Sequence, residues 1–135
     1  MNFVLLVEGK SLNRMVIEDL FEYDEIPATL FSVESGERAI ELARRRKPLL
    51  VLIDLELPGL SGLDTMRRLK GDPQTRDIPV WAISAYAMRG DAAQTVSAGF
   101  DACVAKPIDT KQFAEQIRQF MANVPHPEAS SCTAP

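Results

Sequence analysis

Residues 49–54 have the sequence LLVLID, five consecutive apolar residues that end at an acid. A run this short and this uniformly apolar is typical of a strand buried on both faces, as in a parallel sheet covered by helices. Similar runs occur at residues 3–7, 28–33, 80–83 and 102–105, and segments of helical periodicity separate them. The alternation predicts an α/β fold of (βα)5 type, with one doubly wound, five-stranded parallel sheet.

The predicted helices carry apolar stripes that should face this sheet. In the first and last helices the stripe residues are Leu12, Met15, Val16 and Leu20, and Phe113, Ile117, Phe120 and Met121. Their spacing of three and four residues places each set on one side of a helix. The fourth predicted helix, about residues 89–98, offers only small apolar residues and is expected to be the weakest.

Length and composition limit the classes of protein to consider. The chain has 135 residues and a net charge of −4, and its basic residues form no stripe that could follow a phosphate backbone. We therefore predict one domain, without nucleic-acid binding. No apolar run approaches the roughly 20 residues that span a bilayer, and the N-terminus lacks the features of a secretion signal.

The cysteines and the last residues complete this outline. Cys103 and Cys132 are too few and too oddly spaced for a disulfide framework, which favours a reducing cytoplasm. Residues 123–135 are rich in proline and small polar residues and include the lone His126, flanked by prolines. We predict a folded domain at residues 1–122 followed by a tail or truncated linker.

Polar side chains stand at four of the predicted strand ends. In five βα units the common strand order is 2-1-3-4-5, and ligands bind beyond the carboxyl ends where that order reverses, between strands 1 and 3. These two strands end at Glu8 and Asp54, and the next two end at Ser84 and Lys106. Each residue taken alone is most often an ordinary surface group. Together, two carboxylates, a hydroxyl and an ammonium suit phosphoryl transfer to a carboxylate.

Four segments around these residues resemble response-regulator receiver domains. They are residues 4–8 (VLLVE), 52–62 (LIDLELPGLSG), 78–88 (IPVWAISAYAM) and 99–107 (GFDACVAKP). The likeness runs in register over roughly residues 3–121, and several agreeing motifs are far more specific than one. The chain is thus similar to the CheY-like superfamily with its flavodoxin-like fold, and to the single-domain, DivK-like cell-cycle regulators within it.

The resemblance implies a phosphoacceptor signalling domain of a bacterial two-component phosphorelay rather than an enzyme, with self-catalysed transfer at most. Asp54 would accept a phosphoryl group from a phosphohistidine on a sensor histidine kinase or a histidine phosphotransfer protein. Ser84 would hydrogen bond to that group and Lys106 would pair with it. Family members usually hold the lysine–proline bond in cis, which makes Lys106–Pro107 a candidate.

The family also implies a cofactor, an output face and a shaped loop. Mg²⁺ would be held by Glu8, Asp54 and Glu56, the last mainly through its backbone carbonyl. A downstream protein would bind the face built from helix 4, strand 5 and helix 5. Gly59 and Gly62 would shape the loop that follows the acceptor strand.

Two residues depart from the family pattern. Gly9 stands where receivers carry a second acid that binds Mg²⁺, which should weaken the metal site without excluding it. Glu56 could offer a replacement oxygen, or be a solvent-facing loop acid. Cys103 replaces the usual Tyr or Phe of the switch, as a small buried hydrophobe or, less simply, a redox sensor. Tyr86 is then a candidate to take over part of the gating.

Two other functions remain open at this point. With the metal site disabled by Gly9, the fold could serve as a pseudo-receiver, a constitutive protein-interaction module. Alternatively, Gly9-Lys10-Ser11 between a strand and a helix could end the phosphate-binding loop of a nucleotide enzyme. That motif needs its first glycine at position 4, where the chain has Val4.

Overall fold

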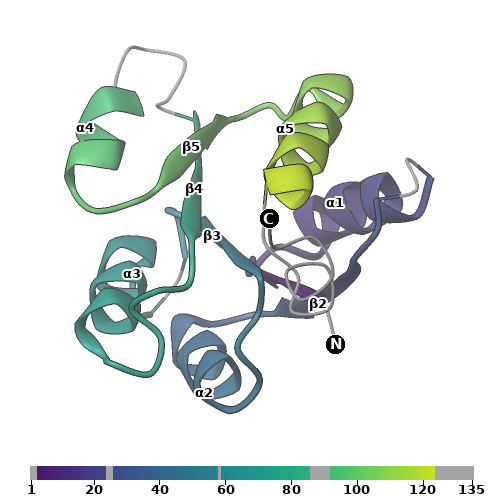
Figure 1. Cartoon of the computed structure of the whole chain (residues 1–135). Coiled ribbons are helices and arrows are strands. Elements are labelled where there is room, and N and C mark those ends of the chain that lie inside the picture. The colour runs from purple at the N-terminus through teal and green to yellow at the C-terminus, as the bar shows by residue number, and fades with distance from the viewer. Residues whose placement is uncertain (1–2, 24–25, 58, 86–91, 124–135) are drawn as a thin grey trace.

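The computed structural model of the chain describes residues 3–23, 26–57, 59–85 and 92–123. Strands and helices alternate from end to end (Figure 1). In chain order they are β1 (Phe3–Val7), α1 (Ser11–Tyr23), β2 (Thr29–Val33), α2 (Gly36–Arg46), β3 (Leu50–Asp54), α3 (Gly62–Gly71), β4 (Val80–Ser84), α4 (Ala92–Ser97), β5 (Ala102–Ala105) and α5 (Thr110–Asn123).

The five strands form one parallel sheet in the order β2-β1-β3-β4-β5. The predicted fold class and strand order are therefore confirmed, and each strand lies within one residue of its predicted bounds. Since β1 and β3 are neighbours while β2 continues on the far side of β1, the order reverses between β1 and β3. The carboxyl ends of these two strands mark the position where this type of sheet binds ligands.

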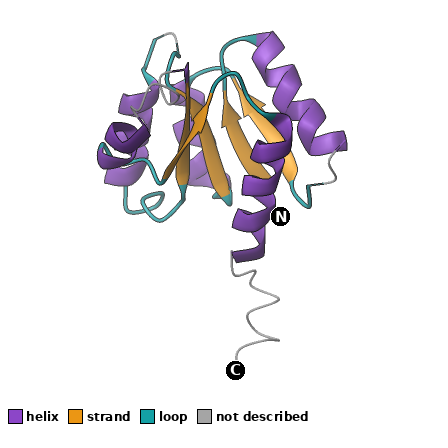
Figure 2. Ribbon diagram, turned by 90° about the horizontal axis from the view of Figure 1, so that it is seen from above, coloured by secondary structure: helices purple, strands orange, loops and turns teal. Residues whose placement is uncertain are grey.

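Helices cover both faces of the sheet (Figure 2). Along β1, Val4 and Leu6 pack toward α1 and α5, whereas Phe3, Leu5 and Val7 pack toward α2 and α3. This alternation of fully buried side chains explains why the strands are apolar throughout. On the α5 side, Trp81 meets Phe120 edge to face, with ring centroids 5.5 Å apart.

The apolar stripe predicted for the first helix is wrong for three of its four residues. Leu12, Met15 and Val16 are 75%, 53% and 45% exposed. The side of α1 that packs on the sheet is instead Ile17, Leu20 and Phe21. Both sets repeat at three and four residues, so periodicity alone did not distinguish them. The consequence is an apolar patch on the surface of α1.

The last helix follows its prediction more closely. Phe113, Ile117 and Met121 are buried and Phe120 is partly buried against the same cluster. Helix α4 spans Ala92–Ser97, inside the predicted range, whose residues 89–91 lie outside the described part. Of the predicted tail, Asn123 is the last residue of α5, and residues 124–135, with His126 and Cys132, lie outside the described part. Among the described helices, none has the length and apolarity needed to cross a membrane.

Candidate functional site

The four predicted site residues lie together at the carboxyl ends of the strands. Asp54 and Ser84 are the last residues of β3 and β4, and Glu8 and Lys106 directly follow β1 and β5. Glu8, Asp54 and Ser84 are almost fully buried, at 1%, 1% and 2% exposure. The amide of Lys106 donates to the carbonyl of Ser84 at 3.0 Å, which fixes the two strand ends relative to each other. The Lys106–Pro107 peptide bond is cis, as predicted.

The carboxylate of Asp54 is held on both oxygens. Lys106 Nζ donates to Oδ2 at 2.7 Å, and the amide of Glu56 donates to Oδ1 at 2.9 Å. Burial opposes ionisation of Asp54, but hydrogen bonds from Glu8, Lys106 and the Glu56 amide outweigh it and lower the pKa of Asp54. An ionised, oriented carboxylate at this position is available as a nucleophile.

The carboxyl group of Glu8 is less well satisfied. Its Oε1 accepts from the amide of Lys10 at 3.1 Å and from Asn13 Nδ2 at 3.4 Å. Its Oε2 is buried and receives no hydrogen bond from a donor group among the described residues, so this oxygen is satisfied only when a proton lies between Glu8 and Asp54. Burial, followed by a hydrogen bond with Asp54, raises the pKa of Glu8 to about 7. A proton shared by the pair therefore resides on Glu8.

Sequence reasoning missed two residues that position Glu8. Asn13 contacts its carboxylate, and Arg14 Nη1 donates to its backbone carbonyl at 2.9 Å. Both lie in the first turn of α1, which begins three residues after Glu8. Polar residues in the first turn of a helix that follows a site strand were the available signal.

The loop after Asp54 needs glycine at two positions. Gly59 has a φ of 73°, in the left-handed region that favours glycine. A Cβ on Gly62 would lie 2.7 Å from the carbonyl oxygen of Asp54, so only glycine lets α3 begin this close to the acceptor strand. Glu56 is exposed, and its contact with the site is made by the backbone amide rather than the carboxylate.

The donor atoms at this edge fit a divalent cation only in part. Within the described residues, no three His, Cys, Asp or Glu side chains gather into a potential metal cage. Glu8 and Asp54 supply two adjacent carboxyl groups, and Glu8 Oε2 receives no hydrogen bond from a donor group in the described residues. Mg²⁺ keeps several waters in most protein sites, and these two carboxyl groups are a partial set of the oxygen ligands that it prefers.

The two residues predicted to take part in the switch are Cys103 and Tyr86. Cys103, in β5, is partly buried against the cluster beneath α2 and α3, and its thiol hydrogen bonds with Thr95 of α4. Burial raises the pKa of Cys103, which disfavours the reactive thiolate. Tyr86 lies outside the described residues.

The nucleotide-binding alternative finds no support in the backbone. Residues 8–10 alone connect β1 to α1, and the amide of Lys10 is already bonded to Glu8. A phosphate-binding loop needs more chain than this to wrap a phosphate before its helix begins.

Comparison with known proteins gives consistent matches. A family model described as the response regulator receiver domain matches residues 4–118. The polar-differentiation response regulator DivK of Brucella ovis is 37% identical over 123 residues, which cover 89% of this chain and 96% of that protein.

Solved structures agree with this match. The receiver domain of the sensor histidine kinase PA1611 from Pseudomonas aeruginosa PAO1, which holds magnesium in its active site cleft, superposes with a TM-score of 0.79. It is 26% identical, and the match covers 90% of this chain and 98% of that domain. The response regulator RPA3017 of R. palustris gives a TM-score of 0.75 at 27% identity, covering 88% of this chain and 90% of that one.

Proposed function

The chain belongs to the response regulator receiver domain family, and we propose that it accepts a phosphoryl group on Asp54 from a phosphohistidine of a partner protein. That partner would be a sensor histidine kinase or a histidine phosphotransfer protein, in a cytoplasmic two-component phosphorelay. The observation that carries the proposal is the buried Asp54 carboxylate paired at 2.7 Å with Lys106 Nζ. Signalling would follow through protein contacts rather than through catalysis on a separate substrate.

The proposed reaction is a displacement at phosphorus. A carboxylate oxygen of Asp54 attacks the phosphorus atom and forms a new oxygen–phosphorus bond. The phosphorus–nitrogen bond breaks, and its electron pair stays on the imidazole that leaves. The ammonium of Lys106 neutralises negative charge on the transferred group, and the Ser84 hydroxyl hydrogen bonds to one of its oxygens. No side-chain base is needed because the nucleophile is already ionised.

A magnesium ion would be held by the carboxylates of Glu8 and Asp54 and by the backbone carbonyl of Glu56. When bound, it supplies positive charge next to the phosphoryl oxygens. Because Gly9 provides no carboxylate, we expect weaker affinity than in a site with a second acid. Glu8 must also lose its proton to bind a cation, since ligand carboxylates bind in the ionised form.

The exposed patch on α1 supports a protein as the phosphodonor. Leu12, Met15 and Val16 are exposed there, and Val16 also lines a cavity of about 240 Å³ that reaches Glu8 and Lys106. An apolar surface beside the acceptor can hold a partner helix while its phosphohistidine approaches Asp54. The patch thus serves binding, which explains why it is not part of the core.

The output face is proposed along α4, β5 and α5. A cavity of about 360 Å³ opens there, lined by Cys103 and Val104 of β5 and by Gln112 and Gln116 of α5, among others. Phosphorylation would shift the equilibrium between two states of this face, so that a downstream protein binds one of them.

A second candidate function is the constitutive interaction module. It is favoured by Gly9, which provides no second acid for a cation, and by the raised pKa of Glu8, which opposes the ionised form that binds a cation. The fold and the α1 patch would serve such a module equally well. The two functions differ in whether Asp54 is ever modified.

Intact mass spectrometry after incubation with acetyl phosphate and millimolar Mg²⁺ distinguishes them. The proposal predicts a gain of one phosphoryl group in the wild type and in Asp77→Asn, an exposed control on the α3–β4 connection. It predicts no gain in Asp54→Asn. Folded protein without an adduct in any of the three would favour the constitutive module.

A further inference from the structure

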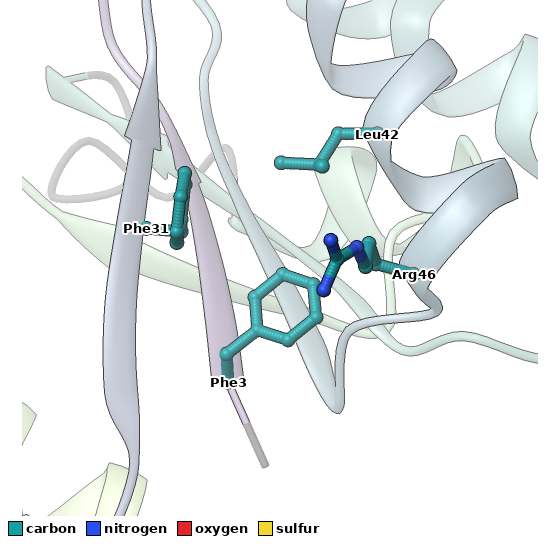
Figure 3. Close-up of a pocket in the computed structure, with 4 residues that line it drawn as sticks. All are labelled: Phe3, Phe31, Leu42 and Arg46. Atoms are coloured by element: carbon teal, nitrogen blue, oxygen red, sulfur yellow. The ribbon is translucent and has the colours of Figure 1, made fainter. Parts of the chain in front are cut away.

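Another pocket lies at the end of the strands opposite to Asp54. Phe3, Phe31, Leu42 and Arg46 line a cavity of about 210 Å³ there (Figure 3). Phe3 begins β1 and Arg46 ends α2, whereas Glu8 follows the other end of β1. Five strand residues span roughly 16 Å, so a molecule in this pocket does not touch the phosphoacceptor site.

The strands provide the aromatic wall of this pocket. Phe3 is in register with Thr29 of β2, and Phe31 is in register with Leu5, so the two rings are diagonal neighbours on one face of the sheet. Their centroids are 6.2 Å apart and their planes meet at 71°. Figure 3 accordingly shows the Phe3 ring face-on and the Phe31 ring edge-on.

The opposite wall comes from one side of α2. Leu42 and Arg46 are four residues apart and therefore point the same way. Leu42 is partly buried, whereas Arg46 is exposed at the last residue of the helix. The pocket between these two walls lies beside β2, which is the edge strand of the sheet.

Phe31 is 54% exposed, although its neighbour Phe3 is 95% buried by the same fold. An exposed aromatic ring contributes little to the core. Single exposed apolar residues are common, but this one forms the rim of a pocket that Phe3 and Leu42 also line. The arrangement leaves a ring-sized apolar surface accessible from solvent.

Arg46 differs from the arginines next to it. Arg44 pairs with Asp72 at 2.9 Å and Arg45 pairs with Glu41 at 3.3 Å. The side chain of Arg46 makes no ion pair or hydrogen bond with any residue in the described ranges. The helix dipole accounts for a cation at the end of α2, but not for the apolar pocket at its side.

We propose that this pocket binds a small amphipathic carboxylate, with one ring between Phe3, Phe31 and Leu42 and the carboxylate on Arg46. Pockets that hold drug-sized ligands measure about 300–1,000 Å³, so a cavity of about 210 Å³ is small for such a ligand and suits a single ring. Guanidinium is the side-chain group best matched to a planar carboxylate. The site is independent of phosphorylation at Asp54 and adds a ligand-binding function to the domain.

Amide chemical shifts of the full chain test the proposal with phenylacetate as the probe. We expect saturable shifts centred on residues 31 and 42, with a Kd on the order of 1 mM. Acetate lacks the ring and phenethyl alcohol lacks the charge, so each should bind at least about fivefold more weakly. Unchanged spectra away from the pocket confirm that each variant is folded.

Three variants assign the two parts of the ligand. Arg46→Gln should weaken the binding of phenylacetate by at least about fivefold, because the contact with its charge is removed. The Kd of phenethyl alcohol should stay within about twofold. Phe31→Ala should weaken both probes. Arg45→Gln is the matched control and should change neither. Binding that fails to saturate, or that weakens equally in Arg45→Gln and Arg46→Gln, would overturn the proposal.

Discussion

The two halves of the strand-end site differ in how well their charges are satisfied. The acceptor half consists of Asp54, Ser84, Lys106 and the backbone amide of Glu56, and the acid half consists of Glu8, Gly9 and the backbone carbonyl of Glu56. In the acceptor half, Asp54 has a donor on each carboxylate oxygen. In the acid half, one buried oxygen of Glu8 receives no hydrogen bond from a donor group in the described chain.

This difference separates two requirements of phosphoryl transfer. A nucleophile must be ionised and oriented, and the acceptor half achieves this with Lys106 and the Glu56 amide. Negative charge on the transferred group must also be neutralised by a bound cation. For this the acid half provides fewer carboxylate ligands than the family pattern, because Gly9 replaces an acid. The raised pKa of Glu8 and the lowered pKa of Asp54 report the same imbalance. We therefore expect substitutions in the two halves to have different effects.

Removing the cation of the acceptor half should have the largest effect. Lys106→Ala leaves Asp54 buried without its charged partner, which we expect to cost about 2 kcal/mol of unfolding free energy at neutral pH. Adduct formation from acetyl phosphate should fall at least about tenfold. Urea unfolding and intact mass measure both, with the exposed Lys111→Ala as control. Equal stability of the two variants would refute the importance assigned to this pair.

Restoring the missing acid should repair the acid half. Gly9→Asp adds a carboxylate next to Glu8, and we expect Mg²⁺ affinity to rise about tenfold, or about 1.4 kcal/mol. Isothermal titration with MgCl₂ compares it with the wild type and with Gly9→Asn, which adds similar bulk without charge. If all three proteins bind Mg²⁺ equally, the weakness attributed to Gly9 is wrong.

Removing the surplus charge of the acid half should stabilise the metal-free protein. The pKa of Glu8 is raised from 4.5 to about 7, so its ionisation costs folded-state stability as pH rises across that range. Glu8→Gln should gain roughly 1 to 2 kcal/mol at pH 8 and nearly nothing at pH 4.5. Chemical denaturation with EDTA present tests this, with the exposed Glu22→Gln as control. A gain that does not depend on pH would contradict the assignment.

A substitution outside both halves should have the smallest effect. Cys103→Ala removes a partly buried thiol and its hydrogen bond with Thr95, which we expect to cost less than about 1 kcal/mol. The rate of adduct formation should stay within about twofold, because Cys103 touches neither half. A large change in that rate would give β5 and α4 a part in the chemistry itself.

The acceptor half and the sheet could be predicted because topology alone determines them. Apolar runs such as residues 49–53 locate the strands, and the strand order then brings the residues at their ends together. The contacts of Glu8 with Asn13 and Arg14 could not be predicted in this way. They depend on side-chain conformations in the first turn of α1, about which the pattern of apolar residues contains no information.

Helix α1 shows a second limit. Leu12, Met15 and Val16 have the same spacing as the three residues that pack on the sheet, so the sequence offers two equivalent stripes. Which stripe is buried depends on how the helix is rotated about its axis, and the spacing does not determine that rotation. The prediction chose the wrong stripe, and the exposed one supports the proposed partner surface.

The most direct test of the central claim is to locate the phosphoryl group after treatment with phosphoramidate, a phosphorus–nitrogen donor, over a series of Mg²⁺ concentrations. Peptide mapping by mass spectrometry identifies the modified residue and intact mass gives the rate. We predict modification of Asp54, with half-maximal rate at a higher Mg²⁺ concentration in the wild type than in Gly9→Asp. Folded protein that remains unmodified in both chains at every Mg²⁺ concentration, or modification at another residue, would contradict the account.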